Sequence, residues 1–401
     1  MLAALPLVFA LIGLTLYVAL AGADFGAGVW QLLAGRGPGG ERIREHAHDS
    51  MAPVWEANHV WLIFVITVFW TAYPVAFGSI ASTLAIPLFI AAVGIILRGA
   101  AYALRSGASG RRELARIDTL FALSSILTPF ALGAAAGGIA SRRVPVGNAA
   151  GHLFTSWLNP TSITIGAVAV TTGAYLAAVY LAADAAAHGD TDLERRFRTR
   201  ALVAGVVAGA IALGAIGVLK ADCHALYREL VRLPALAAVI VSIVAGATTL
   251  ALVWWRRFEA ARYCAALATA AVVAGWAVAQ WPVILPGLTV NRAAAPHDTL
   301  VAVVVAVLAG AVILFPSLGL LFRLLLKGRF HAADRDEQPT GRPPIAVPRL
   351  LARVALACLI AGFGFLNVAD AGWAHGLGVV FLFGFVVTGF LAVVPDALAT
   401  G

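Results

Sequence analysis

The sequence predicts an all-α protein that crosses a membrane many times. Of the 401 residues, 61% are hydrophobic and 12% are charged, whereas soluble domains have about 25% charged residues. Apolar stretches of about 20 residues, the length needed to cross a bilayer as a helix, recur along the chain. No strand-like alternation is sustained, which disfavours a membrane β-barrel.

About eleven stretches satisfy the length expected of a membrane-spanning helix. In chain order they cover residues 2–33, 53–74, 75–104, 118–139, 160–183, 201–219, 234–255, 263–283, 299–326, 350–368 and 377–394. The fifth starts at Pro160, and proline suits the first position of a helix. A polar segment precedes the last two. We therefore predict a membrane domain over residues 1–326, a flexible cytoplasmic linker over 327–349 and a two-helix extension over 350–401.

The charges of the loops predict the orientation of the chain. About 22 Lys or Arg follow the odd-numbered spans and about 6 lie in the other loops, and short basic loops stay in the cytoplasm. We therefore expect the N-terminus outside. The net charge of +8 then reflects membrane orientation. The basic residues form no patch interleaved with aromatic residues, so binding to nucleic acid is not expected.

Polar residues in the first four predicted spans are the candidate functional site. Ionisable groups inside spanning helices are costly and usually face the protein interior. The predicted orientation brings a group of them to one depth, near the cytoplasmic ends of the helices. We expect the acids and the histidine to form a proton path, with the arginines as charge partners. The group is Asp24, Glu56, His59, Arg98 and Asp118, with Trp55, Asn58, Trp61 and Arg105 beside them.

Two other interpretations of these residues stay open. The tryptophans are typical anchors at the membrane interface, where Glu56 and His59 would also be tolerated, and Arg98 and Asp118 can simply end their helices. Intramembrane charges also occur in secondary transporters. However, transporter sites lie at the midplane between inverted repeats, whereas these residues gather at one edge and no inverted repeat is evident.

The sequence gives no metal or haem site. The cysteines, Cys223, Cys264 and Cys358, are far apart and form no CxxC pair. A haem needs an axial His, Met, Cys or Tyr. His59 is the only histidine well inside a predicted span, and no second histidine at its depth is evident. We therefore expect no metal and no directly bound haem.

Eight short stretches carry a resemblance to a known family. They are LAGADFGAG at 20–28, PVWEANHVW at 53–61, ILRGAAYALR at 96–105, RIDTLF at 116–121, WLNP at 157–160, GAYL at 173–176, WPVILP at 281–286 and the loop that follows. Over roughly residues 1–325, the chain resembles subunit II of the cytochrome bd-type quinol oxidases. The eight stretches occur in the same order as in the family, which makes the resemblance specific.

The resemblance implies a fold of two four-helix bundles plus a peripheral helix, in the inner membrane of a bacterium. It implies a heterodimer with a haem-bearing subunit I, which carries b- and d-type haems, oxidises quinol and reduces dioxygen to water. Subunit II has no haem in such complexes, but it supports subunit I, helps to line the cytoplasmic proton path and can hold a structural quinone. The last two spans lie beyond the family's usual end. We expect them to take a peripheral place, as small accessory subunits do.

The motifs depart from the family pattern in the proton path. Ala21 replaces the first acid of the family's first motif, and only the second acid, Asp24, remains. The acid of the second motif is Glu56, one methylene longer than the usual aspartate, and His59 stands where Gln or Glu is common. We expect the longer carboxylate and the titratable imidazole to compensate for the lost acid. Without that compensation, the chain would be a purely structural scaffold.

Overall fold

The computed structural model describes residues 1–35, 37–51, 55–105, 111–326, 349–368 and 372–393. The chain divides into two compact units, Met1–Val312 and Ile313–Gly401, and each is described by itself. Within the described ranges, eight helices are long and apolar enough to cross a membrane, and shorter apolar helices cover Asn58–Ala72, Arg353–Gly362 and Gly376–Thr388. The all-α membrane class is thereby supported, whereas the count of eleven spans and the two-bundle arrangement stay predictions.

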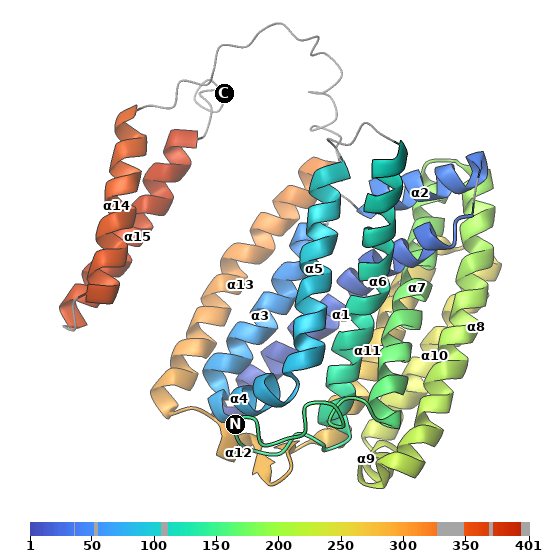
Figure 1. The fold of residues 1–401 in the computed structure, drawn as a ribbon, viewed down its shortest axis with the longest axis horizontal. Coiled ribbons are helices and arrows are strands. Elements are labelled where there is room, and N and C mark those ends of the chain that lie inside the picture. The colour runs from blue at the N-terminus through green and yellow to red at the C-terminus, as the bar shows by residue number, and fades with distance from the viewer. Residues whose placement is uncertain (36, 52–54, 106–110, 327–348, 369–371, 394–401) are drawn as a thin grey trace, which may run out of the picture. The chain divides into compact units, whose positions relative to one another are not determined.

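The elements from η1 to α6 form the N-terminal part of the first unit (Figure 1). A short 3-10 helix, η1 (Leu2–Ala4), leads into α1 (Leu5–Leu32). α2 (Pro38–Met51) is a polar helix in a stretch that we predicted only as a loop. It is followed by α3 (Trp55–Ala72), α4 (Pro74–Thr83), α5 (Ala85–Arg105) and α6 (Arg111–Ala140).

The predicted span 75–104 is wrong as a single helix, because α4 ends at Thr83 and α5 begins at Ala85. Pro87 gives the physical reason. It has no N–H to donate to the carbonyl of Thr83, and its ring would clash with that carbonyl in a continuous helix. The chain therefore breaks at Leu84 and starts a new helix.

The remaining helices of this unit are α7 (Pro160–Ala187), α8 (Thr191–Asp222), α9 (His224–Leu230), α10 (Ala235–Trp254), α11 (Phe258–Gln280) and α12 (Val290–Ala293). α13 (His297–Leu326) begins in this unit and continues past Val312 into the second. α7 begins at the predicted proline, and the Asn159 side chain caps it by accepting from the backbone N–H of Ser162 at 2.9 Å. α8 begins before the predicted residue 201. The predicted span 263–283 ends early, because residues after Gln280 form an antiparallel hairpin of β1 (Val283–Leu285) and β2 (Leu288–Thr289).

α1 packs against α3, α6 and α7, and it also contacts α2 and α11. The contact with α7 is between backbones, since a Cβ atom built on Gly26 would overlap the carbonyl oxygen of Gly173. Beside it, Nε1 of Trp30 donates to the carbonyl of Ala174 at 2.8 Å. Small residues let helices approach this closely in membrane proteins. The glycine-rich motif of α1 is therefore a packing face that fixes how α1 presents Asp24.

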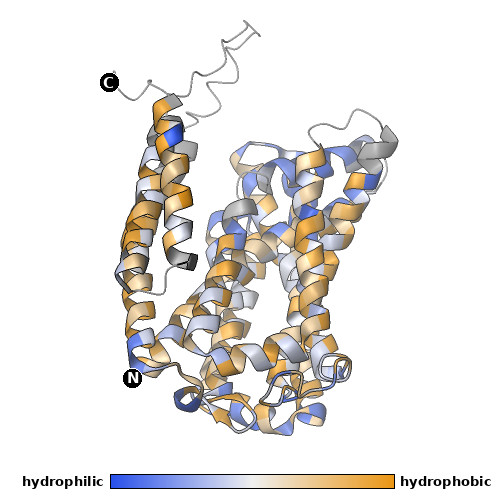
Figure 2. Ribbon diagram, turned by 60° about the vertical axis from the view of Figure 1, so that its left-hand side comes forward, coloured by the Kyte–Doolittle hydropathy of each residue, from blue (hydrophilic) through white to orange (hydrophobic). Residues whose placement is uncertain are grey.

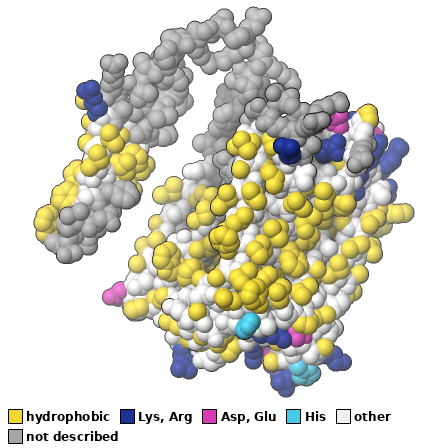
Figure 3. Space-filling view, viewed as in Figure 1, with side chains coloured by type: hydrophobic (Ala, Val, Ile, Leu, Met, Phe, Trp, Pro, Cys, Tyr) yellow, Lys and Arg dark blue, Asp and Glu magenta, His cyan; other side chains and the backbone are white. Residues whose placement is uncertain are grey.

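The surface of the first unit has the distribution expected of a membrane protein. Figure 2 shows apolar residues along the middle of the helices, and Figure 3 shows Lys and Arg side chains gathered near the helix ends. In the second unit, α14 (Arg349–Val368) and α15 (Gly372–Val393) pack against each other. The rings of Phe365 and Phe381 stack at 5.7 Å between centroids.

Candidate functional site

A fully buried ion pair joins α1 to α5. The side chains of Asp24 and Arg98 both have 0% exposure. Nη2 of Arg98 donates to Oδ1 of Asp24 at 2.6 Å, and Nε donates to Oδ2 at 3.1 Å. Nη2 also donates to the backbone carbonyl of Asp24 at 2.6 Å. Two-point contacts between a guanidinium and a carboxylate are strong and fix the geometry of both groups.

One hydroxyl and three aromatic rings complete the surroundings of Arg98. Nη1 donates to Oγ of Ser125 on α6. The guanidinium carbon lies 4.0 Å from the ring centroid of Phe121, 5.1 Å from that of Phe25 and 5.6 Å from that of Tyr102. Cation–π contacts gain strength when the cation is desolvated. The arginine charge is therefore stabilised without direct contact with solvent.

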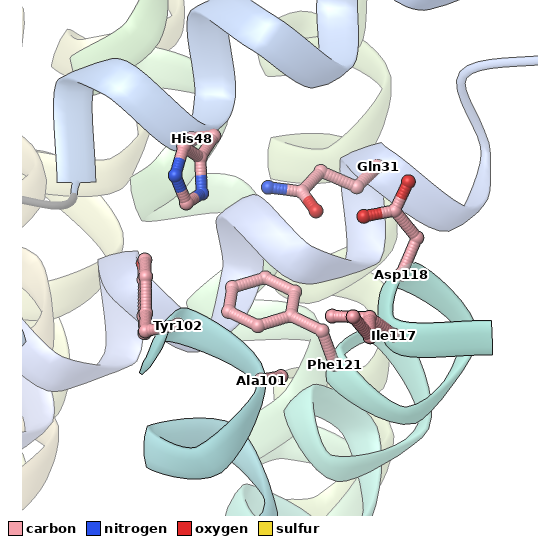
Figure 4. A pocket seen from close by; sticks show the side chains of 7 residues that line it. All are labelled: Gln31, His48, Ala101, Tyr102, Ile117, Asp118 and Phe121. Carbon is pink, nitrogen blue, oxygen red and sulfur yellow. The ribbon is translucent and has the colours of Figure 1, made fainter. Parts of the chain in front are cut away.

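A small cavity adjoins the ion pair, and Tyr102 connects the two. The Tyr102 hydroxyl donates to Oδ1 of Asp24 at 3.2 Å. In Figure 4, Gln31 from α1 and His48 from α2 line the cavity together with side chains of α5 and α6. The cavity volume is about 10 Å³, and the lining residues are Gln31, His48, Ala101, Tyr102, Ile117, Asp118 and Phe121. Polar groups thus continue from the buried carboxylate to the cavity wall.

The polar helix α2 brings His48 to this cavity. Ile43 and Ala47 of α2 are buried in the core. The ring centroids of His48 and Tyr102 lie 5.2 Å apart. Arg42 fastens the outer face of α2 to the start of α8 through Asp190 at 2.6 Å and, at 3.1 Å, through Asp192.

The ion pair between Arg42 and Asp190 persists at neutral pH. The backbone N–H of Leu193 and, more weakly, the Arg42 guanidinium lower the pKa of Asp190 below its ordinary 3.8. Asp190 is therefore ionised in the cell, and its attraction to Arg42 would be lost only as the pH falls into the acid range.

The structure brings part of the predicted cluster together. Asp24 and Arg98 are paired, and Asp118 lines the adjoining cavity. The His59 ring lies edge-on to the rings of Phe25 at 5.8 Å and Tyr17 at 6.1 Å. His59 thus contacts Phe25, one of the two phenylalanines that lie against the Arg98 guanidinium.

Of the neighbours named beside the cluster, Asn58 contacts α1 and Trp61 contacts a residue of its own helix, α3. Nδ2 of Asn58 donates to the carbonyl of Leu20 on α1 at 3.5 Å, and the Trp61 ring lies 6.3 Å from that of Phe64. The side chains of Trp55, Glu56 and Arg105 lie outside the described part of the structure. Their predicted roles therefore stay predictions.

Sequence reasoning missed four polar side chains of this site: Gln31, His48, Tyr102 and Ser125. Two of them were within reach, because Tyr102 lies one helical turn after Arg98 and Gln31 lies two turns after Asp24, on the same helix faces. The other two had no comparable signal. His48 belongs to a segment that has no spanning-helix pattern, and a serine in an apolar helix is not distinctive.

The described side chains of this site make ion-pair, hydrogen-bond and ring contacts. Among them, no group of three or more His, Cys, Asp or Glu side chains could hold a metal ion. The His59 ring contacts the aromatic side chains of Tyr17 and Phe25. This arrangement agrees with a site that stabilises charge inside a membrane domain.

The family model described as cytochrome bd terminal oxidase subunit II matches residues 2–325 of this sequence. The chain belongs to the cytochrome bd terminal oxidase subunit II family. This confirms the resemblance carried by the sequence motifs, and it places the Asp24–Arg98 pair within the region that the family shares. The C-terminal extension lies beyond the matched residues.

Two proteins similar to this chain are also described as bd oxidase components. Cytochrome bd ubiquinol oxidase subunit 2 of Bacillus subtilis (strain 168) is 28% identical over 114 residues, which span 28% of this chain and 33% of that relative. A chain in the structure of bd oxidase from Geobacillus thermodenitrificans is 25% identical, with a TM-score of 0.62. That comparison covers 81% of this chain and 98% of the solved one. The likeness of fold to the solved chain is thus extensive.

Proposed function

We propose that this chain is the haem-free second subunit of a bd-type quinol:oxygen oxidoreductase in a bacterial inner membrane. Its partner is a subunit I that carries b- and d-type haems, takes electrons from quinol and reduces dioxygen to water. The match to the family over residues 2–325 supports this assignment. We also propose that the N-terminus lies outside, that residues 1–326, 327–349 and 350–401 form the membrane domain, the linker and the extension, and that the chain holds a structural quinone.

We further propose that the chain contributes to proton uptake from the cytoplasm. Reduction of dioxygen to water consumes protons, and proton routes through membranes are built from buried ionisable and hydrogen-bonding groups. The observation that carries this proposal is the hydrogen bond from Tyr102 to Asp24, which joins the buried pair to the cavity lined by His48 and Asp118. In this role Asp24 accepts a proton on a carboxylate oxygen, while Arg98 holds the carboxylate in place.

A structural role for the pair is the second candidate, and Ala21 favours it. Ala21 is fully buried and replaces an acid of the family motif. The Asp24–Arg98 pair could then serve only to hold α1 against α5. In both candidate roles the chain is a subunit of the oxidase. The roles differ in whether Asp24 must take up and release a proton during turnover.

Paired substitutions separate the two roles. Asp24→Leu leaves the buried Arg98 charge uncompensated, which costs about 3–5 kcal/mol, whereas replacing both members of a buried pair by apolar residues is often neutral. We expect the double variant Asp24→Leu/Arg98→Met to assemble with a full haem complement and to consume oxygen slowly. The reduced-minus-oxidised spectrum of the purified complex measures haem, and quinol-driven oxygen uptake measures turnover. Full recovery of turnover in the double variant would instead assign the pair a structural role.

Purification of the full chain tests the assignment itself. A tag after Gly401 should co-purify a second large membrane subunit with haem bands and quinol-driven oxygen uptake. A haem-free chain, purified alone from membranes that contain such an oxidase, would contradict the assignment and favour a transporter.

In the complex, Glu56→Gln should slow oxygen uptake without loss of haem if Glu56 belongs to the proton path.

A further inference from the structure

The cavity beside the ion pair contains an unsatisfied buried amide. Gln31 is only 5% exposed, and its Nε2 atom is buried with no hydrogen-bond partner among the described residues. An amide N–H group in this condition is unfavourable, and buried polar groups in folded proteins normally have a protein or water partner. We therefore expect a hydrogen-bond acceptor for Nε2 of Gln31 within the cavity that this side chain lines.

The size and chemistry of the cavity match one water molecule. Its volume of about 10 Å³ is close to the smallest space that accommodates a water. Bound waters need two to four polar partners, and the walls include the polar side chains of Gln31, His48, Tyr102 and Asp118. A larger ligand would not fit, and an apolar atom would leave the amide unsatisfied.

We propose that this cavity binds one ordered water molecule, which accepts a hydrogen bond from Nε2 of Gln31. The water bridges the part of the wall formed by His48 and Asp118 to Tyr102, whose hydroxyl already bonds Asp24. Gln31 does not titrate and is a positioning residue that holds the water. The water site stands on the cavity and the amide, whereas its use during turnover rests on the proposed proton uptake.

Structures of the assembled oxidase, at a resolution that reveals buried waters, test this proposal. Gln31→Met keeps the length of the side chain but removes both polar atoms, and Gln31→Glu keeps a polar group at the same place. We expect water density within hydrogen-bond distance of the wild-type Gln31 side chain, its loss in Gln31→Met and its retention in Gln31→Glu. Absence of density in the wild-type cavity, where other buried waters are visible, would overturn the proposal. Density that persists in Gln31→Met would overturn the role of Gln31.

Kinetics of the same complexes distinguish failure of the water site from failure of the proposed function. Loss of one hydrogen-bonded water should slow oxygen uptake by up to about tenfold in Gln31→Met, with a larger solvent deuterium isotope effect and unchanged haem content. Gln31→Glu should restore most of the rate. If the density disappears in Gln31→Met while rate and isotope effect stay at wild-type values, the water site stands and proton uptake through it is refuted.

Discussion

Arg98 illustrates how a single charge is accommodated inside this membrane domain. Its guanidinium bonds the carboxylate and carbonyl of Asp24, donates to Ser125 and lies over the ring of Phe121 at 4.0 Å. Each contact uses the planar, multi-donor shape of the guanidinium. A lysine would keep the charge but could not make the same fork.

Arg98→Lys should therefore destabilise the oxidase, even though the charge is kept. We expect a loss of about 1–3 kcal/mol, because hydrogen bonds to the carboxylate and to Ser125 are lost in a buried site. The thermal midpoint for loss of the haem spectrum in the purified complex measures the effect. Arg116→Lys, at an exposed position of α6, is the matched control and should leave the midpoint unchanged. Equal midpoints for both variants would show that the fork is unimportant.

The residues of the site were only partly predictable. Asp24 and Arg98 were recognised because charges are rare in apolar segments, and the orientation rule placed them at one depth. The sequence could not show which acid Arg98 selects, since Asp24, Glu56 and Asp118 were all candidates. That choice depends on how α1 and α5 are rotated, and the backbone contact of Gly26 with α7 helps to fix the rotation of α1.

At the scale of elements, the packing of α1 on α7 depends on the absence of a side chain at Gly26. Gly26→Ala should force the two helices apart and destabilise the complex by about 1–3 kcal/mol, the usual cost of overpacking. Gly22→Ala is a control on the same helix, because its Cβ would have ordinary contacts, with Leu176 at 3.7 Å as the nearest. Assembly yield and thermal midpoint should fall for Gly26→Ala alone. A comparable fall for both variants would show that the backbone contact at Gly26 is not the cause, since alanine is the better helix former at either position.

The tether of α2 is a second property at this scale. Arg42→Ala removes the contacts with Asp190 and Asp192 and should loosen α2 without unfolding the spanning helices. We expect faster hydrogen–deuterium exchange over residues 38–51 at neutral pH, where Asp190 is ionised. Glu41→Ala, an exposed change on the same helix, should not alter the exchange. Unchanged exchange in Arg42→Ala would mean that the remaining contacts of α2 hold it in place, namely its buried residues and hydrogen bonds such as that from Ser50 to Asp184 at 2.7 Å.

Apolar spans were predictable as elements, whereas their interruptions and the polar helix were not. Hydropathy locates α7 and α10 well because a bilayer requires continuous apolar length. The break at Leu84 escaped the prediction because Pro87 lies among apolar residues that look continuous. α2 escaped because its helix is stabilised by packing onto the core, and its composition resembles that of a loop.

For the molecule as a whole, the family match ends at residue 325, before the C-terminal helix pair begins. We therefore expect a chain shortened after Leu326 to assemble with its partner, to keep its haem spectrum and to retain oxygen uptake. Purification of the shortened complex, with the full chain as control, measures all three. Loss of assembly would show that α14 and α15 are required by the core of the complex.

Composition predicts the class of the whole molecule because lipid imposes strict requirements on backbone hydrogen bonding. The arrangement of the helices is not determined by composition. Many helices of this chain are apolar around most of their surface, so hydropathy does not say which face meets protein and which meets lipid. Close contacts such as that of Gly26 with Gly173, which make this distinction, became visible only in the structure.

The buried pair also has a consequence for biosynthesis. Asp24 and Arg98 are 74 residues apart in sequence, and a ribosome adds about 5–20 residues per second. The first helix is thus made about 4–15 s before its counter-charge, during which an isolated acid in the bilayer would be unfavourable. We expect α1 to leave the translocon fully only once α5 has arrived, so that the ion pair sets the order in which the first helices are integrated.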